Sequence, residues 1–217
     1  MRIPATVAYV APFAVFIALR WLPFPPQYLS PVRFVLVAAT LAVFSRGVVP
    51  RRIIFPASSI LVGAAVLAIW ILPDLLWPGY REGWLFHNSV MGAARSSLPA
   101  HLKTNMFFIV IRVMESMLLV PILEELFWRG WLLRWTIRSD FESVPLGQYT
   151  ALSFWTVAVL FASEHGPYWD VGLIAGVAYN WWLVRTRSLA DCMVAHAVTN
   201  GLLAGYVLIF DQWQFWL

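Results

Sequence analysis

The sequence is poor in charged residues. Aspartate, glutamate, lysine and arginine make up 12% of its 217 residues, about half of the ~25% that is usual for soluble proteins. Apolar types make up 61%, so the chain has too few charges to cover the surface of a soluble globule. This composition predicts a protein with several membrane-spanning segments.

Cysteine is almost absent. Cys192 is the single cysteine, which excludes a disulfide framework and paired-cysteine zinc or redox motifs. It is expected to be a small apolar filler. The net charge of +4 comes from arginines scattered between apolar runs, not from a basic cluster. No nucleic-acid partner is therefore expected, and the lipid bilayer is the expected surrounding.

Apolar segments close to the ~20 residues that cross a bilayer core recur along the chain. They lack the period-two alternation of barrel strands, and lipid offers no partners for exposed backbone amides, so they are expected to be helices. The first is taken as an uncleaved span, because prolines and not a small-residue cleavage site follow it. The predicted fold is all-α, a polytopic transmembrane helical bundle of seven to eight spans. The segments are 5–22, 31–46, 54–73, 105–127, 149–165, 171–184 and 189–210.

The arginines predict an orientation for this bundle. They gather in the loops after the second, fourth and sixth expected spans, which fall on one face. The positive-inside rule places that face and the N-terminus in the cytoplasm, and the C-terminus outside after a seventh span. The loop 74–104 lies on the opposite face and is expected to hold an interfacial helix near 84–97.

A few ionisable or strongly polar residues lie inside the expected spans. Such residues cost ~2.5–3.5 kcal/mol on insertion scales and mark functional sites. Counting at ~1.5 Å per residue from the arginine-rich face places four polar residues of three helices, Glu124, His165, His196 and Asn200, at similar depths, so these four are expected to meet. The polar residues of the spans occur in pairs. They are Glu124 and Glu125 in PILEELFWRG, Glu164 and His165 in FASEHG, and His196 and Asn200 in AHAVTN.

Helical spacing assigns partners to some of these residues. Positions four apart share a face, so Glu125 is expected to pair with Arg129. The adjacent Glu124 points about 100° away from Glu125 and is left to face His165 and His196.

Other polar positions have simpler interpretations. Arg112 and Glu115, three residues apart, are expected to form a compensated pair. Glu164 is expected to be interfacial, and His87 and His101 lie in a polar loop and are expected to be solvated.

Three motifs on separate apolar helices carry a resemblance to a known family. Their order and types resemble the CAAX prenyl protease and bacteriocin-processing family of intramembrane proteases. The resemblance covers about residues 118–205, and residues 1–100 show none. The motifs are EExxxR at Glu124, Glu125 and Arg129, FxxxH at Phe161 and His165, and HxxxN at His196 and Asn200.

The resemblance divides the chain into two regions. Residues 1–104 are expected to form N-terminal transmembrane helices and an extramembrane loop without a recognised motif, and residues 105–217 a catalytic transmembrane core. The layout is also similar to the CAAX-protease-related proteins that accompany bacterial exosortase sorting systems. This similarity implies a multi-pass protein of the bacterial inner membrane, with an exosortase-type sorting system as a partner.

The resemblance implies a glutamic-type intramembrane endopeptidase, a hydrolase acting on a membrane-associated or lipidated protein or peptide. Peptide hydrolysis without a metal requires a base for water and donors for the developing oxyanion. Glu124 is the expected base and His165 is expected to share its water, while His196 and Asn200 are expected to donate to the oxyanion.

The remaining motif residues are expected to support the site. Glu125 and Arg129 would form a structural pair, and Phe161 would pack against the site. No metal or cofactor is expected.

Two other interpretations fit the same residues. A zinc-dependent protease would use His165, His196 and one glutamate as ligands, although the chain lacks the HExxH pairing. A non-catalytic membrane protein, such as an immunity factor, scaffold or carrier, would keep the polar cluster for helix packing or proton handling. Metal analysis tests the first alternative, and a cleavage assay on membranes tests the second.

Overall fold

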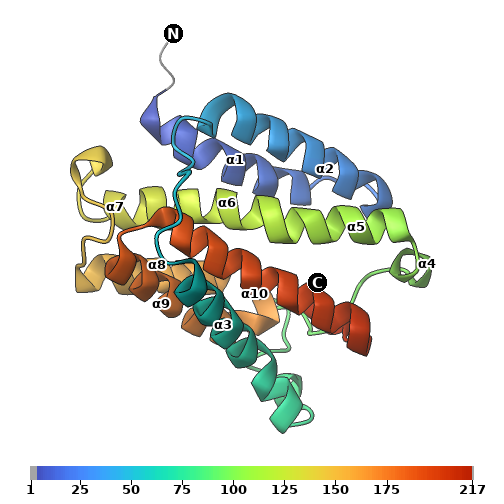
Figure 1. Cartoon of the computed structure of the whole chain (residues 1–217). Helices are drawn as coiled ribbons and strands as arrows, with labels where there is room; N and C mark the ends of the chain where they lie inside the picture. The colour runs from blue at the N-terminus through green and yellow to red at the C-terminus, as the bar shows by residue number, and fades with distance from the viewer. Residues whose placement is uncertain (1–3, 217) are drawn as a thin grey trace.

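The computed structural model describes residues 4–216 of the chain. In this range the long elements are helices packed into one bundle (Figure 1), and each of the seven expected segments is helical. The prediction of an all-α helical bundle is confirmed.

Prolines set the beginnings of the N-terminal helices. After α1 (Ala5–Arg20), α2 (Pro26–Thr40) begins at a proline and continues into a π-helical turn (Leu41–Ser45). A proline at the first helical position loses no hydrogen bond, because that N–H has no partner inside the helix. The helix therefore begins earlier than the apolar run at 31–46, and α3 (Pro56–Leu76) begins in the same way.

One helix, here called the long helix, runs from Met106 to Trp135. It extends beyond the segment expected at 105–127. Pro121 cannot donate to the preceding turn and its ring crowds that turn, and a wider π-helical turn lies directly before it. Its parts are α5 (Met106–Met114), a π-helical turn (Glu115–Leu119), α6 (Val120–Glu125), a second π-helical stretch (Leu126–Leu132) and α7 (Leu133–Trp135).

Three helices follow the long helix: α8 (Ala151–Ser163), α9 (Trp169–Thr186) and α10 (Leu189–Phe210). Side-chain caps begin two of them. Thr150 accepts a hydrogen bond from the backbone N–H of Ser153 in α8, and Ser188 accepts one from Asp191 in α10, which satisfies N–H groups that otherwise lack partners.

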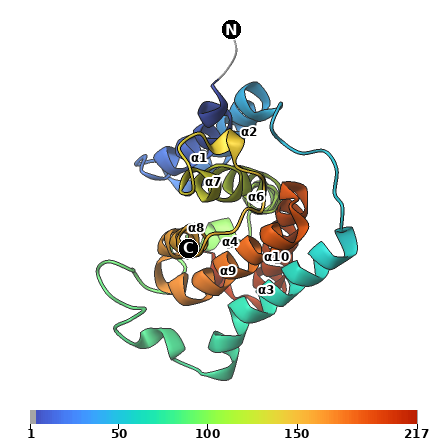
Figure 2. The same ribbon diagram turned by 90° about the vertical axis from the view of Figure 1, so that its left-hand side faces the viewer.

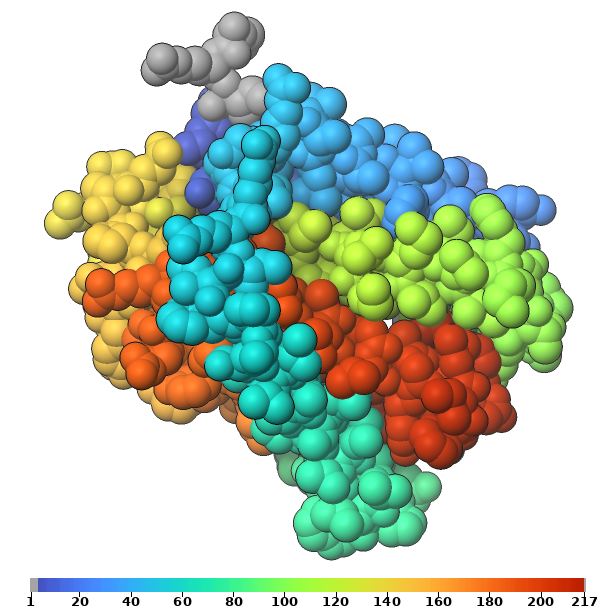
Figure 3. All heavy atoms as spheres, in the orientation of Figure 1, coloured from blue at the N-terminus to red at the C-terminus, as the bar shows by residue number. Residues whose placement is uncertain are grey.

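The long helix lies between two groups of helices. Helices α1 and α2 pack together on one side of it, and α10 packs on its other side and contacts α3 and α9. Helix α8 lies against α9, as the second view also shows (Figure 2). In the space-filling view, α2, the long helix and α10 form successive bands across one face (Figure 3). Residues in the middle of the long helix therefore face both groups.

The arginine-bearing loops are joined by contacts at one end of the bundle. Ser45, before the α2–α3 loop, donates to the carbonyl of Ala8 at 2.6 Å. The Arg134 guanidinium lies 5.4 Å from the ring of Tyr9. Asp191 accepts from the backbone N–H of Phe55 at 2.6 Å. The loops thus share an end, while the placement of that end in the cytoplasm stays a prediction.

Four helices within the described residues are long and apolar enough to cross a membrane. Helices α1 and α8, with 16 and 13 residues, extend only ~24 and ~20 Å, less than the ~30 Å hydrocarbon core. That they and α9 also cross stays a prediction. The four candidates are Pro26–Ser45, Pro56–Leu76, Met106–Trp135 and Leu189–Phe210.

The prediction of an interfacial helix near 84–97 is wrong. This stretch forms turns, between a short 3₁₀ turn (Tyr80–Glu82) and α4 (Ala100–Lys103). The side chain of Asn88 accepts hydrogen bonds from the backbone N–H groups of Val90 and Met91, which offers the backbone an alternative to a helix. Gly92 has a φ of 81°, outside the helical region.

Arg81 fastens this loop to the bundle. Its side chain is buried, and its Nε lies 2.8 Å from Asp74 at the end of α3. Its Nη1 donates to Asp170 at 2.8 Å and to the carbonyl of Pro167 at 2.6 Å. Burial and the neighbouring Asp170 raise the pKa of Tyr80, so its hydroxyl remains a donor to that carboxylate at 3.1 Å. The loop, α3 and the start of α9 thus form one unit.

We predict that Arg81→Gln lowers the melting temperature in detergent, because it leaves two carboxylates without their cation. The expected loss is ~1–3 kcal/mol, below the ~3–5 kcal/mol of a fully buried pair, since both aspartates keep some contact with water. Arg95→Gln, at an exposed arginine of the same loop, is the matched control. Equal melting temperatures for the two variants would contradict this role.

Candidate active site

Three helices bring the predicted catalytic side chains to one cavity. Glu124 of the long helix, His165 at the end of α8, and His196 and Asn200 of α10 all line a cavity of about 390 Å³. The convergence expected from their depths is thus present in the structure. Their catalytic roles stay predictions.

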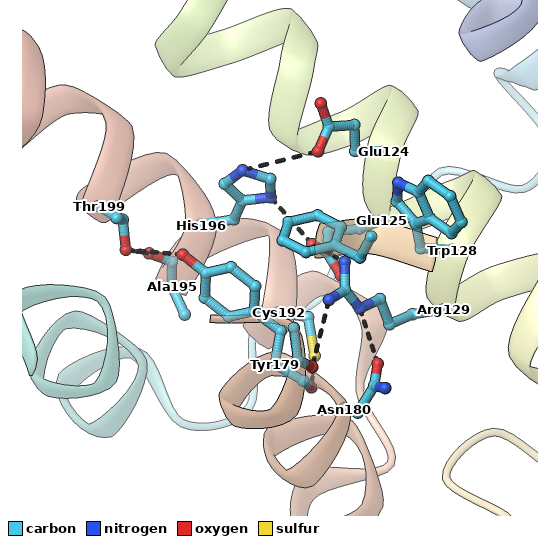
Figure 4. Close-up of polar contacts among 12 residues, drawn as sticks. Glu124, Glu125, Trp128, Arg129, Tyr179, Asn180, Cys192, Ala195, His196 and Thr199 are labelled. Atoms are coloured by element: carbon cyan, nitrogen blue, oxygen red, sulfur yellow. Dashed lines mark hydrogen bonds and ion pairs between the residues drawn. The ribbon is translucent and has the colours of Figure 1, made fainter. Parts of the chain in front are cut away.

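Arg129 joins the helices beneath this cavity. Its Nη1 lies 3.1 Å from Oε1 of Glu125, and both side chains are fully buried, so the expected pair is formed. Its Nε donates to Asn180 of α9 at 3.0 Å, and the Asn180 amide donates to the carbonyl of Phe154 in α8 at 2.9 Å. The contacts of Arg129 with Glu125 and Asn180 are shown in Figure 4. One guanidinium therefore connects the long helix with α8 and α9.

Phe161 packs directly on this pair. Its ring lies 4.4 Å from the Arg129 guanidinium carbon, a cation–π geometry that adds attraction where water is excluded. The ring is also 4.7 Å from that of His165, four residues later. Phe161 thus lies between the buried cation and the cavity, as its supporting role requires.

His196 contacts both glutamates of the first motif. Its Nδ1 lies 2.9 Å from Oε1 of Glu125, and its Nε2 lies 3.9 Å from Oε2 of Glu124 (Figure 4). A carboxylate can only accept, so Nδ1 carries the hydrogen in the first contact. The bond to Glu125 was missing from the sequence prediction, because helical spacing gives no information on how α10 is rotated against the long helix. It directs Nε2 toward Glu124.

Glu124 makes fewer polar contacts within the protein than the adjacent Glu125. Its Oε2 has no hydrogen-bond partner within residues 4–216, and the residue lines the cavity. Glu125, by contrast, is shared by Arg129 and His196. The two adjacent carboxylates are therefore divided as the sequence predicts: Glu125 pairs with Arg129 and Glu124 faces the cavity.

His165 is fixed by the turn that precedes it. Its Nδ1 donates to the carbonyl of Phe161 at 2.7 Å, which leaves Nε2 as the accepting nitrogen. Gly172 lies behind the ring, where a β-carbon would come within 3.2 Å of His165 Cγ, so a small residue lets α9 approach. Gly166, the next residue, has a φ of 52°, and a β-carbon there would come within 2.9 Å of the Met91 carbonyl. The 77–99 loop thus touches the backbone beside His165.

Asn200 has a packing contact in addition to its place in the cavity wall. Its Nδ2 donates to the carbonyl of Ser116 at 2.8 Å, in the first π-helical turn of the long helix. An asparagine amide carries two hydrogens, so one remains for a ligand in the cavity.

Some cavity residues were missed by the sequence prediction. Glu164 was expected to be interfacial, but it lines the same cavity and accepts from the indole of Trp128 at 3.0 Å. Tyr179 of α9 stacks on the His196 ring with 5.0 Å between centroids and donates to Thr199 at 2.8 Å. The sequence did contain a signal for Glu164, because this residue directly precedes the histidine of the FxxxH motif.

Glu115 has a partner on another helix that the sequence prediction missed. Glu115 accepts two hydrogen bonds from Arg33 of α2, both at 2.6 Å. Arg112 lines the cavity, and its guanidinium lies 5.2 Å from the ring of Trp216. Spacing along one helix could not predict a partner supplied by another helix.

The side chains were also compared with metal-site geometry. Within residues 4–216, no three or more His, Cys, Asp or Glu side chains are grouped so as to hold a metal ion. This describes the side chains as they stand, and zinc dependence is decided by the chelation experiment below.

A comparison with protein families identifies the C-terminal half of the chain. Residues 105–202 match the model of the family described as type II CAAX prenyl endopeptidase Rce1-like. This segment is similar to that family. Neither a curated protein nor a solved structure matches the chain. The Rce1-like segment contains all three motifs, and the family is one of proteases. Together with the four apolar helices, the match indicates an integral membrane protein.

We predict that Glu125→Gln destabilises this Rce1-like core, because Arg129 then remains buried without its carboxylate. Removing one partner of a buried pair costs ~3–5 kcal/mol, which should appear as a markedly lower melting temperature in detergent. Glu142→Gln, at an exposed glutamate, serves as control. An unchanged melting temperature combined with complete loss of activity would mean that Glu125, not Glu124, is the base.

Proposed function

We propose that the protein is a glutamic-type intramembrane endopeptidase that hydrolyses a peptide bond of a membrane-associated or lipidated protein or peptide. The observation that carries the proposal is the division of the glutamate pair. Glu125 is taken up by Arg129 and His196, whereas Glu124 faces a cavity that also contains His165 and Asn200. The family match supports a peptidase in general.

Glu124 acts as the base in this proposal. Its carboxylate takes a proton from a water molecule in the cavity, and Nε2 of His165 accepts that water's other hydrogen and orients it. A positioned base of this kind contributes ~10²–10⁴-fold to a rate. The hydrogen bond from His165 to Phe161 supports this role, because it leaves Nε2 as an acceptor.

His196 and Asn200 stabilise the oxyanion. Asn200 has a second amide hydrogen beyond the one given to Ser116. His196 can donate from Nε2 in its imidazolium form, while Nδ1 still donates to Glu125 at 2.9 Å. The Glu125 carboxylate then compensates the charge that forms on the ring. Donors placed in advance act mainly in the transition state, when charge develops on the carbonyl oxygen.

The cavity wall suits an apolar or lipidated substrate. Phe16, Leu203 and Trp216 line it together with the polar groups, and the helices around it expose many large apolar side chains. We place the protein in the bacterial inner membrane with an exosortase-type sorting system as a partner, a proposal supported by the similarity of sequence layout alone.

We predict that Glu124→Gln abolishes proteolysis while the protein still inserts and folds. The amide keeps the shape of the carboxylate but cannot take a proton from water. Comparing membrane proteomes from cells with the wild-type and the variant protein would reveal substrates as proteins processed only by the wild type, with Glu142→Gln as the control. Wild-type processing by Glu124→Gln would refute the assignment of the base.

Metal removal provides a separate prediction. If Glu124 and His165 activate water directly, the purified protein should contain far less than one zinc per chain, and prolonged chelation should leave its activity unchanged. Elemental analysis and turnover before and after chelation measure this. One zinc per chain, with activity lost on removal and restored on return, would instead make the two histidines ligands.

A further inference from the structure

Glu164 is a second carboxylate in the wall of the proposed catalytic cavity. It follows α8 directly and precedes His165 in the chain. Its Oε1 accepts from the indole nitrogen of Trp128 at 3.0 Å. Trp128 lies four residues after Glu124 in the long helix, and Glu124 and Glu164 line the same cavity. The indole therefore holds Glu164 near the segment that carries Glu124.

The two carboxylates interact electrostatically. Glu164 and Glu124 line the same cavity. Two carboxylates in one cavity repel each other when both are ionised, so a state in which the pair holds one proton is favoured. Such a pair contains one group able to accept a proton and one able to give it.

Peptide hydrolysis needs both groups. The base takes a proton from water, but the departing nitrogen also requires a proton, because an amine leaves readily and an amide anion does not. We infer that Glu164 is the general acid that protonates the leaving nitrogen. This inference rests on the function proposed above, in which Glu124 is the base.

The reaction balances as follows. Glu124 takes one proton from water, and the water oxygen bonds to the carbonyl carbon, whose π electrons move to the oxyanion. When the oxyanion re-forms the carbonyl, the carbon–nitrogen bond breaks, and its electron pair takes the proton of Glu164. The products are a carboxylic acid and an amine. Glu124 is then protonated and Glu164 ionised, and transfer of one proton from the first to the second restores the starting state.

Charged residues on several helices lie around Glu164. Arg129 of the long helix and Arg20 of α1 both act on Glu164 electrostatically, and Arg20 lines the cavity. The other titratable groups of this wall are His165 on the same segment, His196 on α10, Glu124, Tyr168, Tyr179 and Arg112.

The test compares Glu164→Gln with Glu124→Gln on two substrates. The first is a quenched fluorescent peptide selected for cleavage by the wild-type protein, and the second is the same compound with an ester in place of the scissile amide. On the peptide, Glu164→Gln should lower kcat by ~10²–10⁴, with KM and melting temperature little changed, because glutamine can still accept from Trp128. On the ester the loss should be much smaller, since an alkoxide leaves with less need of a proton. Glu124→Gln should lose activity on both.

A further variant separates chemistry from positioning. Trp128→Phe removes the hydrogen bond to Glu164 but keeps its carboxyl group, so the peptide kcat should fall less than in Glu164→Gln. The alkaline limb of the kcat profile, which reports loss of the acid's proton, should remain in Trp128→Phe and disappear in Glu164→Gln.

The possible contrary results of these assays have different consequences for the two proposals. Equal losses on peptide and ester for Glu164→Gln, or wild-type turnover of the peptide by this variant, would overturn the acid role. If Glu124→Gln were inactive at the same time, the proposed function would stand. If Glu124→Gln cleaved the peptide normally, the proposed function would fail, and the inference about Glu164 with it.

Discussion

The buried ion pair between Glu125 and Arg129 is the interaction on which the rest of the site depends. Both side chains are fully buried at a distance of 3.1 Å, and neither charge would be stable there alone. The guanidinium reaches α9 through Asn180, and the carboxylate reaches α10 through His196. A single compensated pair thus determines how four helices approach one another, because Asn180 in turn binds the α8 backbone. The cavity lies between these helices, next to the pair.

The backbone of the long helix adapts to this arrangement. Two π-helical stretches lie on either side of the segment that carries the glutamates. Insertions of this kind are frequent at functional sites, because they turn side chains away from the positions of a regular helix. The first stretch also presents the Ser116 carbonyl to Asn200. Helical regularity is therefore lost where the long helix meets α10.

Much of the fold and part of the site could be predicted from the sequence. Hydropathy located the helices, and the four-residue spacing located the Glu125–Arg129 pair, because both depend on one segment alone. The contacts between helices could not be obtained in this way. His196 binds Glu125, Glu115 binds Arg33, and Glu164 binds Trp128, and each depends on the rotation of one helix against another. The prediction of a helix over 84–97 was wrong for a local reason, because the turn at Asn88 competes with a helix.

The 77–99 loop contacts the backbone that directly follows His165. Arg81 binds the Pro167 carbonyl, and the Met91 carbonyl lies against Gly166, whose left-handed backbone leaves no space for a side chain. Both contacts fall within two residues of His165. His165, in the wall of the cavity, is thus attached to this loop through the backbone that follows it. A displacement of this loop would therefore move the backbone next to the His165 ring, because both contacts are made directly to that backbone.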